Sequence, residues 1–503
     1  MKAALVAGLL LVSSIASINA ATDKVFCFFN NNAPYRVGSG KVTIDDIDPS
    51  YCTHIVYSSI TLTSSGTLQL LDSFTDVTNG GFTKFQSICQ RNTKVRCLIG
   101  LNSALSGSKM FSGLMSQAAL RQSAVQTLVN FLTQQNRFDG LDFYWQYPVL
   151  KGGNPEDRTN FVAFLSELSA NLQMYGLLLT ISVAPTSDFF MSSYDVPSLA
   201  RYVDYFNVLA FDLHNYWDGK TGHQTALYRS GKESSLFEAQ LNVEAIVAGW
   251  IAEGAPASKL ILGVTATANV MKLYSGADNG IGARTSGRGM AGPYTTTEGV
   301  LSYHELCLEK RKGGWTTVLD RVQQSYYAYN GQYWATYDEI QSVLLKGSFS
   351  ITRGLGGMAL VGVEDDDVHN QCGNGFSPLL KAINNGLNRV INENNSTPTT
   401  TTVRPITTTT PTTTTTTKAT TTTKATTTTK ATTTTTKSTT APPTLPTTCP
   451  RNGYVRDPNN CSVYYRCIPN GEFFTSWKYS CMNGLYFNIA SSTCDYPNRV
   501  DCS

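Results

Sequence analysis

Charge is scarce in this 503-residue sequence, and the two signs nearly cancel. Charged residues make up 15% of the chain and the formal net charge is +3, with no stretch that concentrates Lys or Arg. Proteins that bind nucleic acid or a membrane surface electrostatically carry such basic stretches, so we expect neither partner. Beyond the N-terminus, no apolar run reaches the length needed to cross a membrane, and the sequence therefore predicts no transmembrane segment.

The N-terminus has the three parts of a secretory signal. Lys2 supplies the positive start, Leu5–Val12 the apolar run, and Asn19-Ala20-Ala21 the small residues of a cleavage site. We therefore assign residues 1–21 to a signal peptide. The mature protein is expected to be secreted, extracellular, soluble and monomeric.

The twelve cysteines fall into two groups of six, and the second group lies within the last 55 residues. In a secreted chain both groups predict disulfides, and their separation predicts two modules. A module as small as the second needs such covalent links because its core is small. No Cys-x-x-Cys pair occurs, so zinc is not expected, and no other metal or cofactor is predicted. The second group consists of Cys449, Cys461, Cys467, Cys481, Cys494 and Cys502.

Residues 396–448 between the two groups are almost all Thr, with Pro and regularly spaced Lys. Such a stretch cannot bury a core. It is typical of an O-glycosylated stalk, and an unmodified flexible linker is the alternative. Asn394, Asn395 and Asn460 lie in N-glycosylation sequons.

In residues 22–395, short apolar runs alternate with amphipathic stretches such as Gln117–Gln135 and Arg158–Tyr175. Eight strands that alternate with helices predict an α/β fold, a (β/α)8 TIM barrel. The alternation is interrupted from about Asn269 to Trp334, where Gly, Tyr and Thr are frequent. The candidate strands are Lys24–Phe29, His54–Thr61, Lys94–Gly100, Gly140–Tyr144, Leu177–Ala184, Tyr205–Phe211, Lys259–Thr265 and Gly357–Val363.

One of these strands opens the segment around which the large domain is organised, Phe138-Asp139-Gly140-Leu141-Asp142-Phe143-Tyr144-Trp145-Gln146-Tyr147-Pro148. The polar side chains at 142, 144 and 146 alternate onto one face. A polar row on an otherwise apolar strand suits a barrel whose interior ends in an active site. The alternative is a core strand with no functional role.

The segment resembles the signature F-D-G-x-D-x-D-W-E-Y-P of the glycoside hydrolase family 18 chitinases. It departs from the signature at two positions, where Tyr144 replaces an aspartate and Gln146 replaces the catalytic glutamate. In that family the glutamate protonates the glycosidic oxygen, and the substrate's own N-acetyl group is the nucleophile. A primary amide cannot act as an acid, and loss of a general acid costs about 10²–10⁴ in rate. The resemblance therefore implies a chitinase-like protein that is not an enzyme.

The same resemblance implies further features of the large domain. The interruption at about 269–334 corresponds to the family's small α+β insertion domain. Cys27 is expected to pair with Cys52, and Cys307 with Cys372. Cys89 and Cys97 have no family counterpart, so they either pair with each other or remain thiols. The peptide bond between Gln146 and Tyr147 is expected to be cis.

Several groups that line the family's sugar-binding groove are altered. Tyr147, Asp212 and Trp217 persist as candidate ligand-binding residues. Asp139 and Asp142 also persist, with a ligand contact and a purely structural role equally open. A lost aromatic side chain removes a large apolar contact with the sugar, which makes the groove a doubtful chitin site. The altered positions are Asn32, Asn102 and Val361 for tryptophans, Phe211 for a tyrosine and Asn269 for an arginine.

Residues 449–503 resemble the peritrophin-A type chitin-binding domain, through Tyr464-Tyr465-Arg466-Cys467 and Cys494-Asp495-Tyr496-Pro497. The resemblance implies pairing of the first cysteine with the third, the second with the sixth and the fourth with the fifth. Aromatic rings are natural platforms for the flat C–H faces of sugars. Some of the module's aromatic residues must form its core, and we expect an exposed subset of Tyr465, Phe474 and Trp477 to bind the sugar.

The leading interpretation is a non-catalytic chitinase-like protein that binds chitin or chitooligosaccharides mainly through the C-terminal module. The combination of barrel, stalk and module is similar to the chitinase-like allergens of mites. One alternative is an active chitinase that uses another acid, with Glu156 the nearest in sequence. Another is a structural component of a chitin matrix.

Overall fold

The computed structural model describes residues 22–391 except 104–105, 136, 186–191, 234 and 236, together with parts of the C-terminal module. The chain forms two units, Met1–Ser396 and Thr397–Ser503. The predicted signal peptide, the Thr-rich stretch, Asn394, Asn395, Cys449, Cys481 and Cys502 lie outside the described residues. Among the described helices, none has the length and apolar character required of a membrane span.

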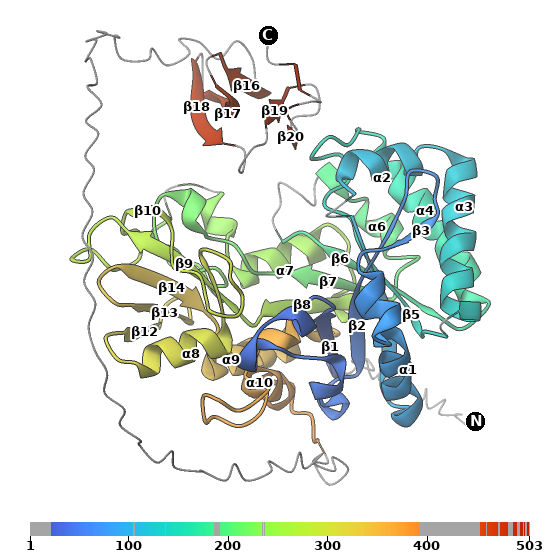
Figure 1. The fold of residues 1–503 in the computed structure, drawn as a ribbon, viewed down its shortest axis with the longest axis horizontal. Coiled ribbons are helices and arrows are strands. Elements are labelled where there is room, and N and C mark those ends of the chain that lie inside the picture. The colour runs from blue at the N-terminus through green and yellow to red at the C-terminus, as the bar shows by residue number, and fades with distance from the viewer. Residues whose placement is uncertain are drawn as a thin grey trace, which may run out of the picture. The chain divides into compact units, whose positions relative to one another are not determined.

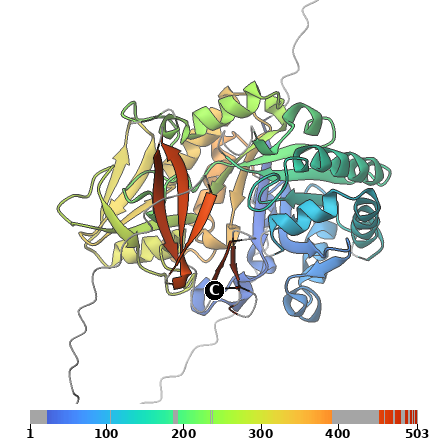
Figure 2. The ribbon, with the colours of Figure 1, turned by 90° about the horizontal axis from the view of Figure 1, so that it is seen from above.

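Eight parallel strands close into a barrel, which confirms the predicted fold (Figures 1 and 2). Their order is β1-β15-β8-β7-β6-β5-β4-β2, and β1 pairs with β2 to complete the ring. The short β3 (Leu68–Leu70) adds an antiparallel edge to β2. The barrel strands are β1 (Lys24–Asn30), β2 (His54–Leu62), β4 (Arg96–Asn102), β5 (Gly140–Tyr144), β6 (Leu178–Val183), β7 (Tyr205–Leu209), β8 (Leu260–Thr265) and β15 (Gly357–Val361).

These strands form because their sequences are apolar on both faces, as parallel strands covered on both sides require. One set of side chains fills the barrel, including Phe26, Val56, Leu98, Ile261 and Ala359, which are all fully buried. The other set packs outward against the helices. The helices are α1 (Gly81–Arg91), α2 (Ser108–Met115), α3 (Ala118–Asn130), α4 (Asp157–Gln173), α6 (Val196–Leu199), α7 (Val243–Ala252), α9 (Ile340–Thr352) and α10 (Pro378–Gly386).

The insertion domain is a second, antiparallel sheet, shown on the left of Figure 1. It extends slightly beyond the predicted 269–334, because its first strand begins at Thr267 and its last ends at Tyr337. Helix α8 (Tyr303–Arg311) begins with a capping box formed by Ser302 and Glu305. The strands are β9 (Thr267–Leu273), β10 (Thr285–Arg288), β11 (Val300–Ser302), β12 (Thr316–Asp320), β13 (Ser325–Tyr329) and β14 (Tyr333–Tyr337).

The C-terminal unit contains two small antiparallel sheets. Strands β16 (Gly453–Asp457), β17 (Asn460–Asn470) and β18 (Phe473–Ser480) form the first, and β19 (Tyr486–Asn488) and β20 (Thr493–Asp495) form the second. Antiparallel hairpins of this size are marginal in isolation, which fits a module with six cysteines in its sequence.

The two disulfides expected in the large unit are present. Cys27 is bonded to Cys52 and Cys307 to Cys372. Cys89 and Cys97, whose state the sequence left open, are bonded to each other. In the C-terminal unit Cys461 is disulfide-bonded, but its partner lies outside the described residues.

The barrel interior contains a histidine whose burial should make stability depend on pH. His54 is 5% exposed, and its ring stacks on Phe26 at a centroid distance of 4.1 Å. Burial lowers the pKa of His54 to about 3. The unfolded chain therefore binds a proton below about pH 6.5 while the folded chain does not.

We expect the free energy of unfolding to fall by about 1.4 kcal/mol per pH unit well below pH 6.5 because of this residue. In His54→Phe the contribution should be absent. Urea titrations between pH 4 and pH 7 measure the difference. Equal slopes for the two proteins would show that His54 is not kept neutral by the fold.

Candidate active site

The signature segment leaves the barrel at the carboxyl end of β5. Trp145 is buried and its Nε1 donates to Ser108 Oγ at 2.9 Å. The backbone N–H of Gln146 donates to Ser103 Oγ at 2.7 Å. These two bonds hold the chain as it turns from the strand, so that Tyr144 and Gln146 lie at the end of the barrel where TIM-barrel active sites form.

Tyr144 and Tyr147 face each other at this end. Their hydroxyl oxygens are 3.4 Å apart, and their rings lie edge to face with centroids 6.3 Å apart. Burial, followed by the proximity of Tyr147, raises the pKa of Tyr144 well above 10. The phenol is therefore neutral, and the neighbouring amide of Gln146 has no acidic proton. The phenol is therefore a much weaker proton donor than a carboxylic acid would be at this position.

Tyr147 is fixed on several sides. Its carbonyl accepts from Ser108 Oγ at 2.7 Å, and Lys151 Nζ lies 4.9 Å from its ring centroid. Burial raises the pKa of Tyr147 and lowers that of Lys151. The Gln146–Tyr147 peptide bond is cis, as predicted.

Asp142 lies inside the barrel and is fully hydrogen-bonded to protein. It accepts from Thr180 Oγ1 at 2.5 Å, Ser182 Oγ at 2.7 Å and Asn207 Nδ2 at 2.8 Å. Burial raises the pKa of this carboxyl, and the three hydrogen bonds oppose the shift. These contacts support the structural role for Asp142, because they join β5 to β6 and β7.

Asp139 lies at the opposite end of β5 from the site. It precedes the first residue of the strand and accepts from the backbone N–H of Cys97 at 2.8 Å and from Arg96 Nη1 at 3.3 Å. Its side chain is therefore used to join β5 to β4. Asp139, Cys89 and Cys97 are close enough to surround a metal ion, but the disulfide occupies both sulfur atoms.

Asp212 and Trp217 come from the segment after β7. Asp212 has a left-handed backbone with a φ of 57°, and its Oδ1 accepts from Asn269 Nδ2 at 2.9 Å. Part of the residue is exposed, but the surrounding protein removes its carboxyl group from water and so raises its pKa. The hydrogen bond from Asn269 opposes this shift. Trp217 is 57% exposed, beside Tyr216 at a centroid distance of 5.2 Å. The site thus retains one carboxylate and one open aromatic ring.

Glu156 is exposed and lies directly before α4, outside the barrel strands. The next residue, Asp157, is fully buried and accepts from Ser112 Oγ at 2.6 Å and from the backbone N–H groups of Val149 at 3.1 Å and Asn154 at 2.8 Å. Asp157 therefore shapes the loop after the signature, whereas Glu156 remains on its outer side.

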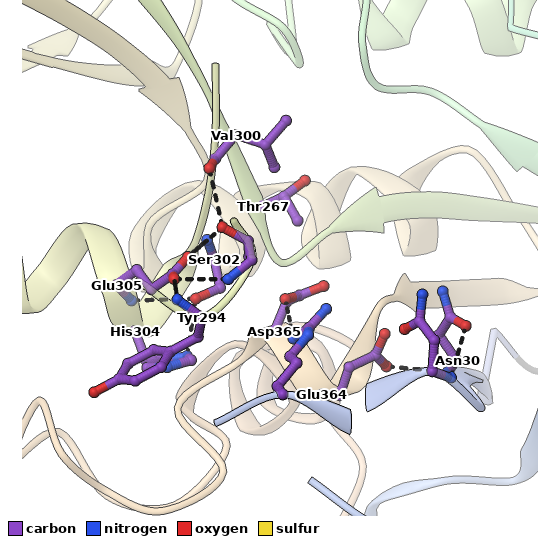
Figure 3. Close-up of polar contacts among 12 residues, drawn as sticks. Asn30, Thr267, Tyr294, Val300, Ser302, His304, Glu305, Glu364 and Asp365 are labelled. Carbon is purple, nitrogen blue, oxygen red and sulfur yellow. Dashed lines mark hydrogen bonds and ion pairs between the residues drawn. The ribbon is translucent and has the colours of Figure 1, made fainter. Parts of the chain in front are cut away.

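A cluster of buried acids after β15 was not recognised in the sequence (Figure 3). Glu364 Oε2 accepts from the backbone N–H of Asn30 at 3.2 Å, and Arg36 Nη1 lies 2.6 Å from Asp365 Oδ1. Burial, followed by the charge of Asp365, raises the pKa of Glu364 to about 8. The run of four acidic residues at 364–367 was the available signal. The cluster joins the loops after β15 and β1.

Figure 3 also shows how Glu305 organises the start of α8. Its carboxylate accepts from three backbone N–H groups, those of Tyr294 at 2.6 Å, Thr295 at 2.9 Å and Ser302 at 2.8 Å. These contacts fix a corner of the insertion domain.

Tyr465, one of the three candidate ligand-binding aromatics of the C-terminal module, is buried, so its assignment as a sugar contact is wrong. Tyr465 is 4% exposed, and its hydroxyl donates to Asp457 Oδ2 at 2.9 Å. Tyr465 is therefore part of the core of this small module. Phe474 and Trp477 belong to β18. Their side chains, like those of Cys467 and Cys494, lie outside the part of the chain that the structure describes. Asn460 is exposed.

Comparison with known proteins gives two family matches. The family described as "Glycosyl hydrolases family 18" matches residues 24–366, and the one described as "Chitin binding Peritrophin-A domain" matches residues 449–502.

Two curated relatives and one solved structure illustrate the similarity. The chain is 30% identical to the Endochitinase of Manduca sexta over 99% of both proteins. It is 34% identical over 371 residues to Probable chitinase 10 of Drosophila melanogaster, of which it covers only 16%. The structure is that of human YKL-39, described as a pseudo-chitinase with retained chitooligosaccharide binding. It is 30% identical, with a TM-score of 0.68, over 73% of this chain and all of that one.

Proposed function

The chain belongs to glycosyl hydrolases family 18, and on that premise we propose that it is a secreted, non-catalytic chitin-binding protein. The observation that carries the proposal is the pair Tyr144 and Gln146 at the carboxyl end of β5. One is a neutral phenol in contact with Tyr147, and the other is an amide. The carboxylic acid that donates the proton in the family is therefore replaced by an amide, and neither signature position carries a carboxyl group.

Chitin binding is supported by the match of residues 449–502 to a chitin-binding family. It is also supported by human YKL-39, which is described as a pseudo-chitinase that retains oligosaccharide binding. We assign the principal contact to the C-terminal module, with Phe474 and Trp477 as its ligand-binding aromatics. Tyr147, Asp212 and Trp217 are the proposed sugar contacts of the barrel.

The same proposal includes the organisation of the chain. Residues 1–21 are cleaved on secretion, 22–395 form the barrel with its insertion domain, and 396–448 form a glycosylated stalk. The stalk tethers the module at 449–503 to the barrel, so that both can meet one insoluble polymer.

Deletion of residues 449–503 is expected to lower retention on insoluble chitin by at least about tenfold. The reason is loss of the module that carries the principal contact, while the barrel keeps its own core and three disulfides. Pull-down isotherms of the secreted full chain and of residues 22–395 measure the difference. Equal retention of the two proteins would contradict the assignment of binding to the module.

A second candidate is chitin hydrolysis that uses another acid. Asp212 favours this candidate, because the pKa of its carboxyl is raised. It also lies close enough to Tyr147 for its negative charge to raise the pKa of that phenol. If the purified protein releases product from chitooligosaccharides, Asp212→Asn should abolish the release and Gln146→Ala should not. Absence of turnover in the unmodified protein rules this candidate out.

A further inference from the structure

Three side chains that can bind a metal ion meet at the amino end of the barrel, away from Tyr144 and Gln146. Cys89 lies in the last turn of α1, Cys97 is the second residue of β4, and Asp139 directly precedes β5. Their sulfur and carboxylate oxygen atoms all lie within 4.8 Å of one another. Among the described residues, this is the one group of three His, Cys, Asp or Glu side chains close enough to share an ion.

The backbone fixes these residues without the help of a metal. The N–H of Asp139 donates to the carbonyl of Cys97 at 2.8 Å, and the Asp139 carboxylate accepts from the N–H of Cys97 at 2.8 Å. The carbonyl of Asp139 accepts from the N–H of Leu178, at the start of β6, at 2.9 Å. Ligands that are carried by strands and a helix and fixed in this way are preorganised for an ion.

The two sulfur atoms become ligands only after reduction, because they form a disulfide with each other. Cys89 is half-buried and Cys97 is fully buried, so a thiol reductant attacks Cys89 Sγ. Its sulfur bonds to Cys89, and Cys97 leaves as a thiolate with the electron pair of the broken bond. A second thiol attacks the sulfur of the first and releases Cys89 as a thiolate. Two thiols are thereby oxidised to one disulfide, and their two protons pass to the solvent.

The resulting donor set suits zinc. Zn²⁺ takes Cys sulfur and Asp oxygen in tetrahedral sites, and three protein ligands leave the fourth position to water. Two thiolates and the Asp139 carboxylate carry three negative charges. The ion neutralises two of them and Arg96, whose Nη1 lies 3.3 Å from Asp139 Oδ1, neutralises the third. The side chains of Arg96 and Asp139 are 57% and 29% exposed, so an ion can enter from the solvent.

We propose that reduction of the Cys89–Cys97 disulfide converts it into a Zn²⁺ site, formed by the two thiolates and the Asp139 carboxylate. The oxidised chain does not bind the ion there, because each sulfur is bonded to the other. In the reduced chain the ion takes over from the disulfide in joining α1 to β4, and it adds a bond to the residue before β5. The inference does not depend on the proposed function, since the sugar site lies at the other end of the barrel.

The test uses the full chain, reduced with a small thiol that is then removed in the absence of oxygen. Peptide mapping verifies that Cys89 and Cys97 are free, and circular dichroism that the fold persists. Titration with Co²⁺ should give a thiolate-to-metal charge-transfer band that saturates at one equivalent and disappears when Zn²⁺ is added. The oxidised protein should give no band.

Two variants and a matched control locate the ion. Cys89→Ser combined with Cys97→Ser should lose the band under the same reducing treatment. Asp139→Asn keeps an oxygen that can accept from the Cys97 N–H but loses the charge, and should weaken Co²⁺ binding at least about tenfold, because even changes beyond the ligands commonly cost that much. The control is Asp45→Asn, an acid with a half-exposed side chain, which should bind like the unmodified protein.

Several results would overturn the inference. No band in the reduced unmodified protein, or a disulfide that resists an excess of thiol, would show that no site forms. An equal band in the double cysteine variant would place the ion on other cysteines, and equal affinity in Asp139→Asn would remove the carboxylate from the site. If reduction unfolds the large unit, or if the oxidised protein gives the same band, reduction does not create the site and the inference is wrong.

Discussion

Restoring both signature residues, with Gln146→Glu and Tyr144→Asp in one chain, is expected to give at most weak chitinase activity. The rate should remain about 10²–10⁵ below that of an ordinary family member. The reason is that a general acid is effective only when the scissile oxygen is held within hydrogen-bond reach of it. That positioning depends on side chains other than the two restored ones.

In this protein, the side chains at the positions expected to supply these contacts either make other contacts or lack the required polar group. Asn269 donates its amide to Asp212 and to the carbonyl of His214, at 2.9 and 3.3 Å. Val361 packs against the apolar filling of the barrel, and Phe211 has no hydroxyl. Each polar contact missing from the transition state costs roughly 1–3 kcal/mol, and two or three such losses account for the expected deficit.

Release of product from a short fluorogenic chitooligosaccharide measures the effect. Gln146→Glu alone is the matched control and should be less active than the double variant, because Tyr144 still stands at the second signature position. A double variant as active as an ordinary chitinase would show that the sugar-binding contacts are intact and that only the acid pair was lost.

The barrel could be predicted from the sequence because each of its strands is an apolar run covered on both faces. Gly140–Tyr144 was predicted with the bounds that the structure has. The insertion domain was placed slightly too narrowly, since β9 follows β8 after one residue and no turn signal separates them.

The environments of single side chains could not be predicted in the same way. Asp139 and Asp142 are three residues apart in sequence, yet Asp139 precedes β5 and binds β4, whereas Asp142 lies within β5 and binds β6 and β7. Only the register of the strands reveals this difference. Tyr465 was misassigned because the sequence shows that the module is rich in aromatic residues but not which of them are buried in its core. Glu364 gains its partner Asn30 from β1, which is more than 300 residues away in the chain.

The largest effect on stability is expected from Lys346→Met. Lys346 and Asp338 are fully buried, with Nζ 2.6 and 2.7 Å from the two carboxylate oxygens, and Nζ also donates to Thr225 Oγ1 at 2.6 Å. Asp338 directly follows β14 of the insertion domain, Lys346 belongs to α9, and Thr225 lies between β7 and α7. The three groups therefore join the insertion domain to the barrel.

Removal of the ammonium group leaves the Asp338 carboxylate buried and uncompensated, which costs about 3–5 kcal/mol. Urea denaturation at neutral pH measures the loss. Lys346→Met combined with Asp338→Asn should recover part of it, because the remaining side chain is then neutral. The control is Lys84→Met, which breaks a pair with Asp45 that is 3.4 Å long and half exposed; it should change stability by less than about 1 kcal/mol. A loss in Lys346→Met no larger than in this control would show that the buried ion pair does not hold the two parts together.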